Sequence, residues 1–346
     1  MIRVLVVDDS PLMRRIIATV LKKDPYIEVV GFASNGEEAF QKIEQIHPDV
    51  VTMDIEMPVM NGLEAIEKIM KRHPVPIVVI STLTRRGADI TIKALSLGAV
   101  DFVLKPSAYS HEIQKVEDEI ITKVKYAYQT KVGYSRVIES SHRNLLPKID
   151  SRIPEAILIG VSTGGPKTLM DIIPFISKDI GVPIFIVQHM PPLFTKQLAE
   201  TLQSKSEIVV KEAEDGELVR KNVVYIVPGG FQMEIKKESR GNIIKIVSGP
   251  EDLLYKPSVN YVGFSLAETY RDGLFAIMLT GMGNDGLEAF KYIKKIGGFI
   301  IAESEATAVV YGMPRAVVEA GIADIVAPSN AIAAILTNII KREQKN

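Results

Sequence analysis

Short apolar runs alternate with amphipathic stretches along the whole chain. The runs are rich in Val and Ile, whereas stretches such as 12–21 and 37–45 place an apolar residue every three or four positions. This alternation is typical of βα units, in which helices cover strands that are buried on both faces of a parallel sheet. The sequence therefore predicts an α/β fold.

The pattern divides the chain into two sets of such units. From about residue 126 to 153 the apolar periodicity is lost, and Gly, Ser and Pro are frequent, as in connecting segments. A length of 346 residues is enough for two domains of ordinary size. We predict an N-terminal domain at 1–122, a linker at 123–152 and a C-terminal domain at 153–346.

Each predicted domain contains its own doubly wound sheet. The five strands expected in the N-terminal domain lie at 4–7, 29–32, 50–53, 77–80 and 102–104. The six expected in the parallel sheet of the C-terminal domain lie at 156–161, 183–188, 223–227, 274–279, 299–302 and 325–327. Turn residues at 229–230 and 236–242 indicate a β-hairpin insertion in the second domain.

The composition excludes several classes of protein. A formal net charge of -1 gives no field that would attract nucleic acid or anionic lipid. The chain has no cysteine, which excludes disulfides, thiolate catalysis and cysteine-ligated zinc. The first apolar run is too short for a signal-peptide core, and no later one approaches the roughly 18 residues of a membrane span. We expect a cytoplasmic protein that neither binds nucleic acid nor inserts into a membrane.

Acidic residues follow two predicted strands of the first domain. Asp8 and Asp9 come after 4–7, and Asp54 comes after 50–53. Because the carboxyl ends of parallel strands share one edge of the sheet, these side chains can converge on a hard divalent cation such as Mg²⁺. Each also has a simpler interpretation, in which Asp8 and Asp9 precede a helix capped by Ser10 and Asp54 belongs to a turn.

Two further polar residues favour a shared binding site over separate roles as helix caps and turn residues. Ser81 stands at the end of the fourth predicted strand, and Lys105, followed by Pro106, stands at the end of the fifth. Five such residues at the ends of four strands are poorly explained by coincidence.

The segments V-V-D-D-S-P-L-M-R-R, M-D-I-E-M-P-V-M-N-G, V-I-S-T and D-F-V-L-K-P together resemble the receiver domain of two-component response regulators. The resemblance covers roughly the first 120 residues. It implies that Asp54 accepts a phosphoryl group from a histidine kinase and that Asp8, Asp9 and Asp54 hold Mg²⁺. It also implies that Ser81 is the switch hydroxyl and that Lys105 contacts the phosphoryl group.

A candidate nucleophile lies at the first strand of the second domain. The strand at 156–161 continues into G-V-S-T-G, which matches the G-x-S-x-G pattern and places Ser162 at the exposed end of the strand. A glycine-rich turn with a serine can also cap a helix or bind a phosphate. The motif alone therefore leaves a nucleophile and a structural turn both open.

Elimination identifies partners for this serine. His189 is the single histidine after the linker, and it too ends a predicted strand. Asp285 lies in a glycine-rich loop after the strand at 274–279, whereas Asp171, Asp215 and Asp252 do not follow an apolar strand in this way. The sequence thus predicts a Ser-His-Asp triad. Its chain order differs from that of the α/β-hydrolases, so the motif does not indicate membership of that fold.

The segments G-V-S-T-G-G-P, V-Q-H-M-P-P-L-F-T, L-T-G-M-G-N-D-G and Y-G-M-P-R-A-V resemble the catalytic domain of bacterial chemotaxis protein-glutamate methylesterases, which also carry an N-terminal receiver. In that family the matching serine, histidine and aspartate form the triad, and the amides that match Thr163 and Met282 form the oxyanion hole. The chain departs from the family at Val161 and Lys256, where members often have a smaller residue and an arginine.

The resemblance implies hydrolysis of glutamyl methyl esters on chemoreceptors, without a metal in the catalytic domain. It implies a chemotaxis histidine kinase as phosphodonor and control of the hydrolase by phosphorylation at Asp54. Deamidation of receptor glutamines passes through the same kind of intermediate and is chemically open to the same site. Two alternatives remain: an output domain that only binds DNA or a protein, and a hydrolase for a small soluble ester. The charge and the α/β pattern argue against DNA.

Overall fold

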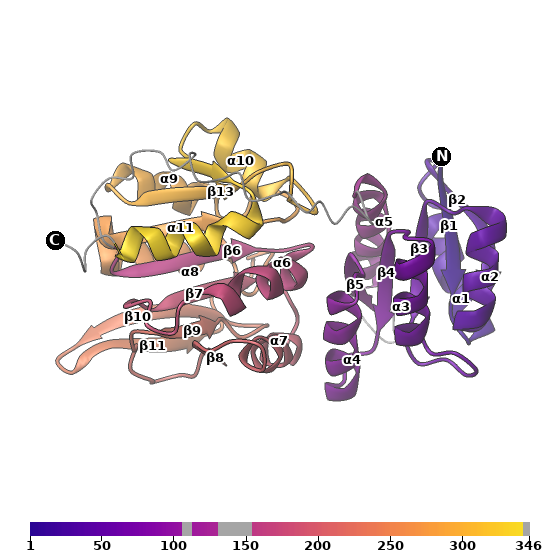
Figure 1. Cartoon of the computed structure of the whole chain (residues 1–346), viewed down its shortest axis with the longest axis horizontal. Coiled ribbons are helices and arrows are strands. Elements are labelled where there is room, and N and C mark those ends of the chain that lie inside the picture. Colours follow the sequence, from indigo (N-terminus) through magenta and orange to yellow (C-terminus); the bar gives the residue numbers. More distant parts are fainter. Residues whose placement is uncertain (106–112, 131–153, 342–346) are drawn as a thin grey trace. The chain divides into compact units, whose positions relative to one another are not determined.

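A computed structural model describes residues 1–105, 113–130 and 154–341 of the chain. The chain forms two compact units, 1–136 and 137–346, and each contains its own parallel sheet (Figure 1). The predicted α/β class and the two doubly wound sheets are confirmed. No helix in the described part of the chain is both long enough and apolar enough to cross a membrane.

The first unit is a five-stranded parallel sheet with the strand order β2-β1-β3-β4-β5. Its strands are β1 (Ile2–Val7), β2 (Ile27–Ala33), β3 (Val50–Asp54), β4 (Ile77–Ser81) and β5 (Asp101–Leu104). Its helices are α1 (Pro11–Leu21), α2 (Gly36–Ile46), α3 (Gly62–Arg72), α4 (Arg85–Ser96) and α5 (Ile113–Gln129). Strand β2 lies on one side of β1, and β3, β4 and β5 lie on the other side. The strand order therefore reverses between β1 and β3, and the carboxyl ends of these two strands form the topological switch point where ligands bind in such sheets.

Polar caps explain where the first four helices of this unit begin. The side chain of the residue before each helix accepts a hydrogen bond from a backbone amide of the first turn, which satisfies a donor that the helix itself leaves unpaired. These caps are Ser10, Asn35, Asn61 and Thr84. Helices α1, α2 and α4 therefore start after short loops, whereas a longer loop at 55–61 separates β3 from α3.

The second unit is a seven-stranded parallel sheet with the order β14-β13-β12-β6-β7-β9-β8. Its strands are β6 (Ala156–Val161), β7 (Ile184–Gln188), β8 (Val209–Glu212), β9 (Val223–Ile226), β12 (Leu274–Met278), β13 (Phe299–Glu303) and β14 (Ile325–Ala327). The order reverses between β6 and β12, which places a second switch point at the ends of these two neighbouring strands.

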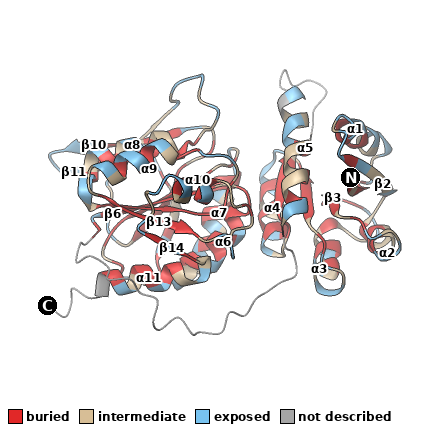
Figure 2. Cartoon of the chain, turned by 90° about the horizontal axis from the view of Figure 1, so that it is seen from above, coloured by how far each residue is buried: buried red, intermediate tan, exposed pale blue. Residues whose placement is uncertain are grey.

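Helices cover both faces of this second sheet. They are α6 (Gly165–Ile172), α7 (Phe194–Gln203), α8 (Val259–Tyr270), α9 (Leu287–Lys295), α10 (Met313–Glu319) and α11 (Ser329–Lys341). Helices α8 and α9 lie on one side of the strands, and α6 and α11 lie on the other (Figure 2). The predicted hairpin is present as β10 (Gln232–Glu238) and β11 (Gly241–Val247), and it shares a buried apolar cluster with α8, α9 and α10.

Strand β8 was not predicted from the sequence. It is a short edge strand in which Val209 is half exposed and Lys211 interrupts the apolar residues. Edge strands often carry charged side chains, which prevent pairing with other chains. The apolar run that marks a central strand is therefore absent at β8.

The predicted start of the linker, at 123, is wrong. Helix α5 continues to Gln129, because Val124 and Ala127 pack in the core of the first unit. Residues 123–129 thus belong to the first unit, and 131–152 lie outside the described residues.

Val59 lies in the loop between β3 and α3 with a φ of 69° and is 86% exposed. A β-branched residue is strained in this left-handed region, whereas Asn tolerates it. We expect Val59→Asn to raise the free energy of unfolding of the first unit by about 1 kcal/mol, measured by calorimetry on the full chain. Val209→Asn, at an exposed position of strand β8, is the control and should not stabilise. No gain at Val59 would show that the loop is not strained.

Candidate functional site

Ser162 lies in the turn between β6 and α6, at the switch point of the second sheet. Its amide donates to the Thr280 carbonyl at 2.9 Å, and its carbonyl accepts from the Gly165 amide at 2.8 Å. Gly164 has a φ of 77°, a conformation that glycine adopts without strain. The turn presents the serine side chain at the carboxyl edge of the sheet.

The structure brings the three predicted triad residues together in one hydrogen-bonded chain. Nδ1 of His189 lies 3.1 Å from Oγ of Ser162, and Nε2 lies 2.8 Å from Oδ2 of Asp285. The histidine and aspartate side chains are 8% and 7% exposed. A base within hydrogen-bond reach of a hydroxyl, oriented in turn by a carboxylate, is the arrangement that activates a serine.

The imidazole of His189 is presented the opposite way round from that in the chymotrypsin-type triad. There Nε2 faces the serine and Nδ1 faces the aspartate, whereas here Nδ1 faces Ser162 and Nε2 faces Asp285. A proton on Nε2 is held by the carboxylate, so Nδ1 is the nitrogen that can accept a proton from the serine.

Asp285 is held by the first turn of helix α8. Its Oδ1 accepts from the Ser258 hydroxyl at 2.9 Å and from the Asn260 amide at 3.2 Å, and its Oδ2 accepts from the Val259 amide at 2.7 Å. Burial alone would raise the pKa of Asp285, but the hydrogen bond from His189 and the amides of α8 hold this pKa below its usual range. The carboxylate is therefore charged and fixed in direction.

Two backbone amides near Ser162 are free to donate. No described residue accepts a hydrogen bond from the amides of Thr163 or Met282. The loop after β12 comes close to Ser162 because Gly281 has no side chain. A β-carbon at Gly281 would lie 2.9 Å from Cβ of Ser162 and 2.3 Å from Sδ of Met313. Both predicted oxyanion donors are thus brought to the same edge as Ser162.

A buried glutamate supports this loop. Glu303 at the end of β13 is fully buried and accepts from the Thr280 amide at 2.7 Å and the Thr307 hydroxyl at 2.9 Å. Burial raises the pKa of Glu303 to about 7. The Thr280 hydroxyl in turn donates to the Thr163 carbonyl at 2.9 Å, which joins the two loops that carry the candidate oxyanion donors.

Sequence reasoning missed several supporting residues of the site. Gln188, directly before His189, donates to the Ser162 carbonyl at 2.9 Å and to the His189 carbonyl at 3.3 Å. Glu303 and Ser258 join distant segments of the chain. Ser258 could have been found, because serine before an apolar stretch is a typical helix cap, but its contact with Asp285 has no signal in the sequence.

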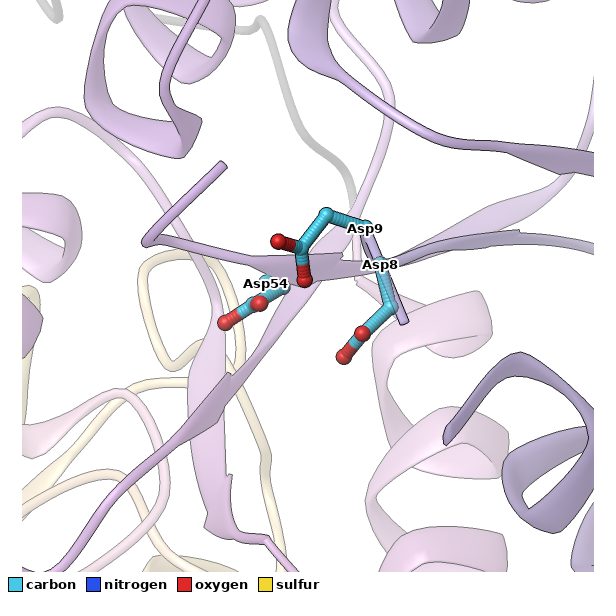
Figure 3. A group of neighbouring side chains, drawn as sticks. All are labelled: Asp8, Asp9 and Asp54. Carbon is cyan, nitrogen blue, oxygen red and sulfur yellow. The ribbon is translucent and has the colours of Figure 1, made fainter. Parts of the chain in front are cut away.

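The first unit brings its three predicted acidic residues together. Asp8 and Asp9 follow β1, Asp54 ends β3, and one carboxylate oxygen from each lies within 4.8 Å of the other two (Figure 3). Oδ2 of Asp8 is buried and accepts no hydrogen bond from the described residues, although Nζ of Lys105 lies 3.2 Å away. Clustered carboxylate oxygens of this kind fit Mg²⁺, which takes oxygen ligands.

Lys105 joins this acidic group as predicted. Its ammonium lies 2.8 Å from Oδ2 of Asp54. Burial raises the pKa of Asp54, and the Asp8 carboxylate adds to this effect. Burial works against the charged form of Lys105, but Asp54 and Asp8 outweigh it and raise the pKa of the lysine.

Ser81 lines the same small cavity as Asp54, but its hydroxyl is engaged by helix α4. It accepts a hydrogen bond from Thr91 at 2.6 Å and lies 3.4 Å from the Gly87 carbonyl. Thr91 is fully buried and was not predicted to take part in the site. Any change in which Ser81 turns to Asp54 must break this contact with α4.

Known proteins resemble the chain over both units. The model of the CheB methylesterase family matches residues 157–336, and that of the response regulator receiver domain matches residues 4–117. A protein-glutamate methylesterase/protein-glutamine glutaminase of Geobacillus kaustophilus is 43% identical over 98% of this chain and 99% of its own length. A protein of the same name from Methanococcoides burtonii is 45% identical over 95% of each chain.

A solved structure agrees with these sequence relationships. The crystal structure of the Thermotoga maritima CheB methylesterase catalytic domain matches with a TM-score of 0.53 and 42% identity, over 54% of this chain and 99% of that one. The predicted resemblance to receiver and methylesterase domains, in that order, is confirmed. The chain therefore belongs to the CheB methylesterase family, in the form that carries a response regulator receiver domain before its methylesterase domain.

Proposed function

We propose that the chain is a phosphorylation-controlled protein-glutamate methylesterase, which hydrolyses glutamyl methyl esters on chemoreceptors in the cytoplasm. The observation that carries this proposal is the hydrogen-bonded chain from Ser162 through His189 to Asp285 at a switch point of the second sheet. The relatives that match both units bear the name of this activity.

In the first half of the reaction, Oγ of Ser162 attacks the ester carbonyl carbon while Nδ1 of His189 takes the hydroxyl proton. Asp285 holds the other ring nitrogen and stabilises the imidazolium. The carbonyl oxygen becomes an oxyanion, which the Thr163 and Met282 amides stabilise by roughly 3 kcal/mol per donor, as in other acyl-transfer enzymes. The intermediate then expels methoxide, which receives the proton from His189 and leaves as methanol.

In the second half, water attacks the acyl-enzyme. Nδ1 of His189 takes one proton of the water as its oxygen bonds to the acyl carbon. The bond to Oγ of Ser162 then breaks, and the proton passes from His189 back to the serine. The products are free enzyme and a glutamate side chain, which ionises at neutral pH. A glutamine amide can react by the same path and release ammonia, so we include deamidation in the proposal.

Release of methanol from chemoreceptors that carry glutamyl methyl esters tests this function. We expect methanol release from such receptors to be much faster than hydrolysis of a small chromogenic ester at the same concentration. Faster hydrolysis of the small ester would favour a hydrolase for soluble esters. Hydrolysis of neither would favour an output domain that only binds.

In the first unit, we propose that Asp54 is phosphorylated by a chemotaxis histidine kinase and that Asp8, Asp9 and Asp54 hold Mg²⁺. A bound Mg²⁺ supplies positive charge that neutralises the transferring phosphoryl group. Lys105, 2.8 Å from Asp54, provides a second positive charge. Ser81 then exchanges its hydrogen bond from Thr91 for one to the phosphoryl group, and this exchange couples Asp54 to helix α4.

We expect a small phosphodonor with Mg²⁺ to raise methyl-ester hydrolysis by the full chain about tenfold, the effect of shifting a two-state equilibrium by about 1.4 kcal/mol. Asp54→Ala should remove this stimulation. The measurement is methanol release with and without the donor, and Asp118→Ala, at an exposed position of helix α5, is the control. Equal stimulation of Asp54→Ala would exclude Asp54 as the acceptor.

A further inference from the structure

The phenol ring of Tyr255 stacks on the imidazole of His189. The two ring centroids are 4.2 Å apart, and the ring planes differ by 2°. Tyr255 is half-buried and lies in the segment just before helix α8. A parallel contact at this distance covers one face of the imidazole and keeps water from it.

The two hydrogen bonds of the imidazole leave one motion open. Nδ1 faces Ser162 and Nε2 faces Asp285, but a small tilt of the ring plane about the Cβ–Cγ bond only bends these two hydrogen bonds. Such a tilt carries Nδ1 and its lone pair off the line to the serine hydroxyl, and proton transfer requires that alignment. A flat ring packed on the face of the imidazole opposes this tilt.

Hydrogen bonds connect Tyr255 to Ser258, which holds Asp285. Its carbonyl accepts from Nε2 of Gln232 at 2.8 Å, and Oε1 of Gln232 accepts from the amide of Ser258 at 2.8 Å. Ser258 is the residue whose hydroxyl donates to Asp285. At the other end of the ring, a β-carbon built on Gly283 would lie 3.9 Å from the Tyr255 hydroxyl, so the phenol extends from His189 to the loop of Met282.

We propose that Tyr255 is a positioning residue, whose ring holds His189 in the plane in which Nδ1 meets the hydroxyl of Ser162. This role rests on the proposed function, because it acts through the histidine of that reaction. The ring of Tyr255, not its hydroxyl, carries the effect. Phenylalanine should therefore replace it and leucine should not.

The test compares Tyr255→Leu with Tyr255→Phe in the full chain, with a chemoreceptor fragment that carries glutamyl methyl esters as substrate. We expect kcat of the leucine variant to fall about tenfold, which is about 1.4 kcal/mol, while KM stays within twofold. The phenylalanine variant should keep kcat within twofold of the parent. Tyr292→Leu is the matched control, because Tyr292 on α9 packs against Phe264 and should leave both constants unchanged.

The rate at which a fluorophosphonate labels Ser162, measured per folded molecule, serves as a second readout if Tyr255→Leu folds poorly. It should fall in the leucine variant and recover with phenylalanine. Unchanged kcat and labelling in Tyr255→Leu, or equal losses in both variants, would overturn the role. A change confined to KM would make Tyr255 a substrate contact and also overturn it. Ser162→Ala in the same assay separates the two proposals, since activity without Ser162 contradicts the proposed function itself.

Discussion

Ser162→Ala should lower methyl-ester hydrolysis by about a million-fold, the loss seen when the nucleophile of a serine hydrolase is removed. The reason is that Ser162 is the proposed nucleophile that forms the acyl-enzyme, and the proposed oxyanion donors, the Thr163 and Met282 amides, do not replace it. The measurement is methanol release from methylated chemoreceptors. Ser204→Ala, at an exposed serine just after α7, is the matched control and should retain full activity.

The loss in the double variant with His189→Ala should not exceed that of either single variant. Nδ1 of His189 is 3.1 Å from Oγ of Ser162, and the two groups act on one proton, so removing either one disables both. Losses that multiplied in the double variant would show that the histidine acts in a separate step. Activity of Ser162→Ala within a hundredfold of the parent chain would mean that a different nucleophile operates.

The general position of both sites could be predicted from the sequence for one physical reason. Asp8, Asp54, Ser162 and His189 all follow strongly apolar runs, and the carboxyl ends of parallel strands meet at one edge of a sheet. The apolar runs are strong because central strands of a parallel sheet are buried on both faces. Strand β8 is an edge strand and is only partly buried, so its sequence does not contain a continuous apolar run.

The contacts that orient the catalytic groups could not be predicted in this way. Ser258 and Tyr255 reach the triad from the segment that leads into α8. Gln232, the first residue of β10 in the hairpin, is hydrogen-bonded to both of them. Such contacts depend on how loops pack in three dimensions, and neither periodicity nor spacing encodes them. The orientation of the His189 ring, with Nδ1 toward the serine, also follows from this packing.

The surroundings of Asp285 make its replacement by asparagine a second informative variant. Each carboxylate oxygen accepts two hydrogen bonds: Oδ1 from Ser258 and Asn260, and Oδ2 from Val259 and His189. An asparagine must place its NH₂ group at one of these positions, where it faces a backbone amide that can only donate. The variant therefore loses one of these hydrogen bonds in either orientation.

Both orientations of asparagine also impair the histidine. With the NH₂ group at the Oδ2 position, Nε2 of His189 must accept, and the ring proton moves to Nδ1, which can then no longer take the proton of Ser162. With the NH₂ group at the Oδ1 position, the tautomer is kept, but the negative charge that stabilises the imidazolium is lost.

We therefore expect Asp285→Asn to lower kcat by a factor on the order of 10⁴, as in a serine protease with the same substitution, and to lower the thermal midpoint of the second unit slightly. Methanol release and calorimetry measure the two effects. Asp252→Asn, at an exposed aspartate in the loop before α8, is the control for the change of charge and should alter neither quantity. A loss below tenfold for Asp285→Asn would exclude Asp285 as the residue that orients His189, because the charge and the tautomer would then both be dispensable for catalysis.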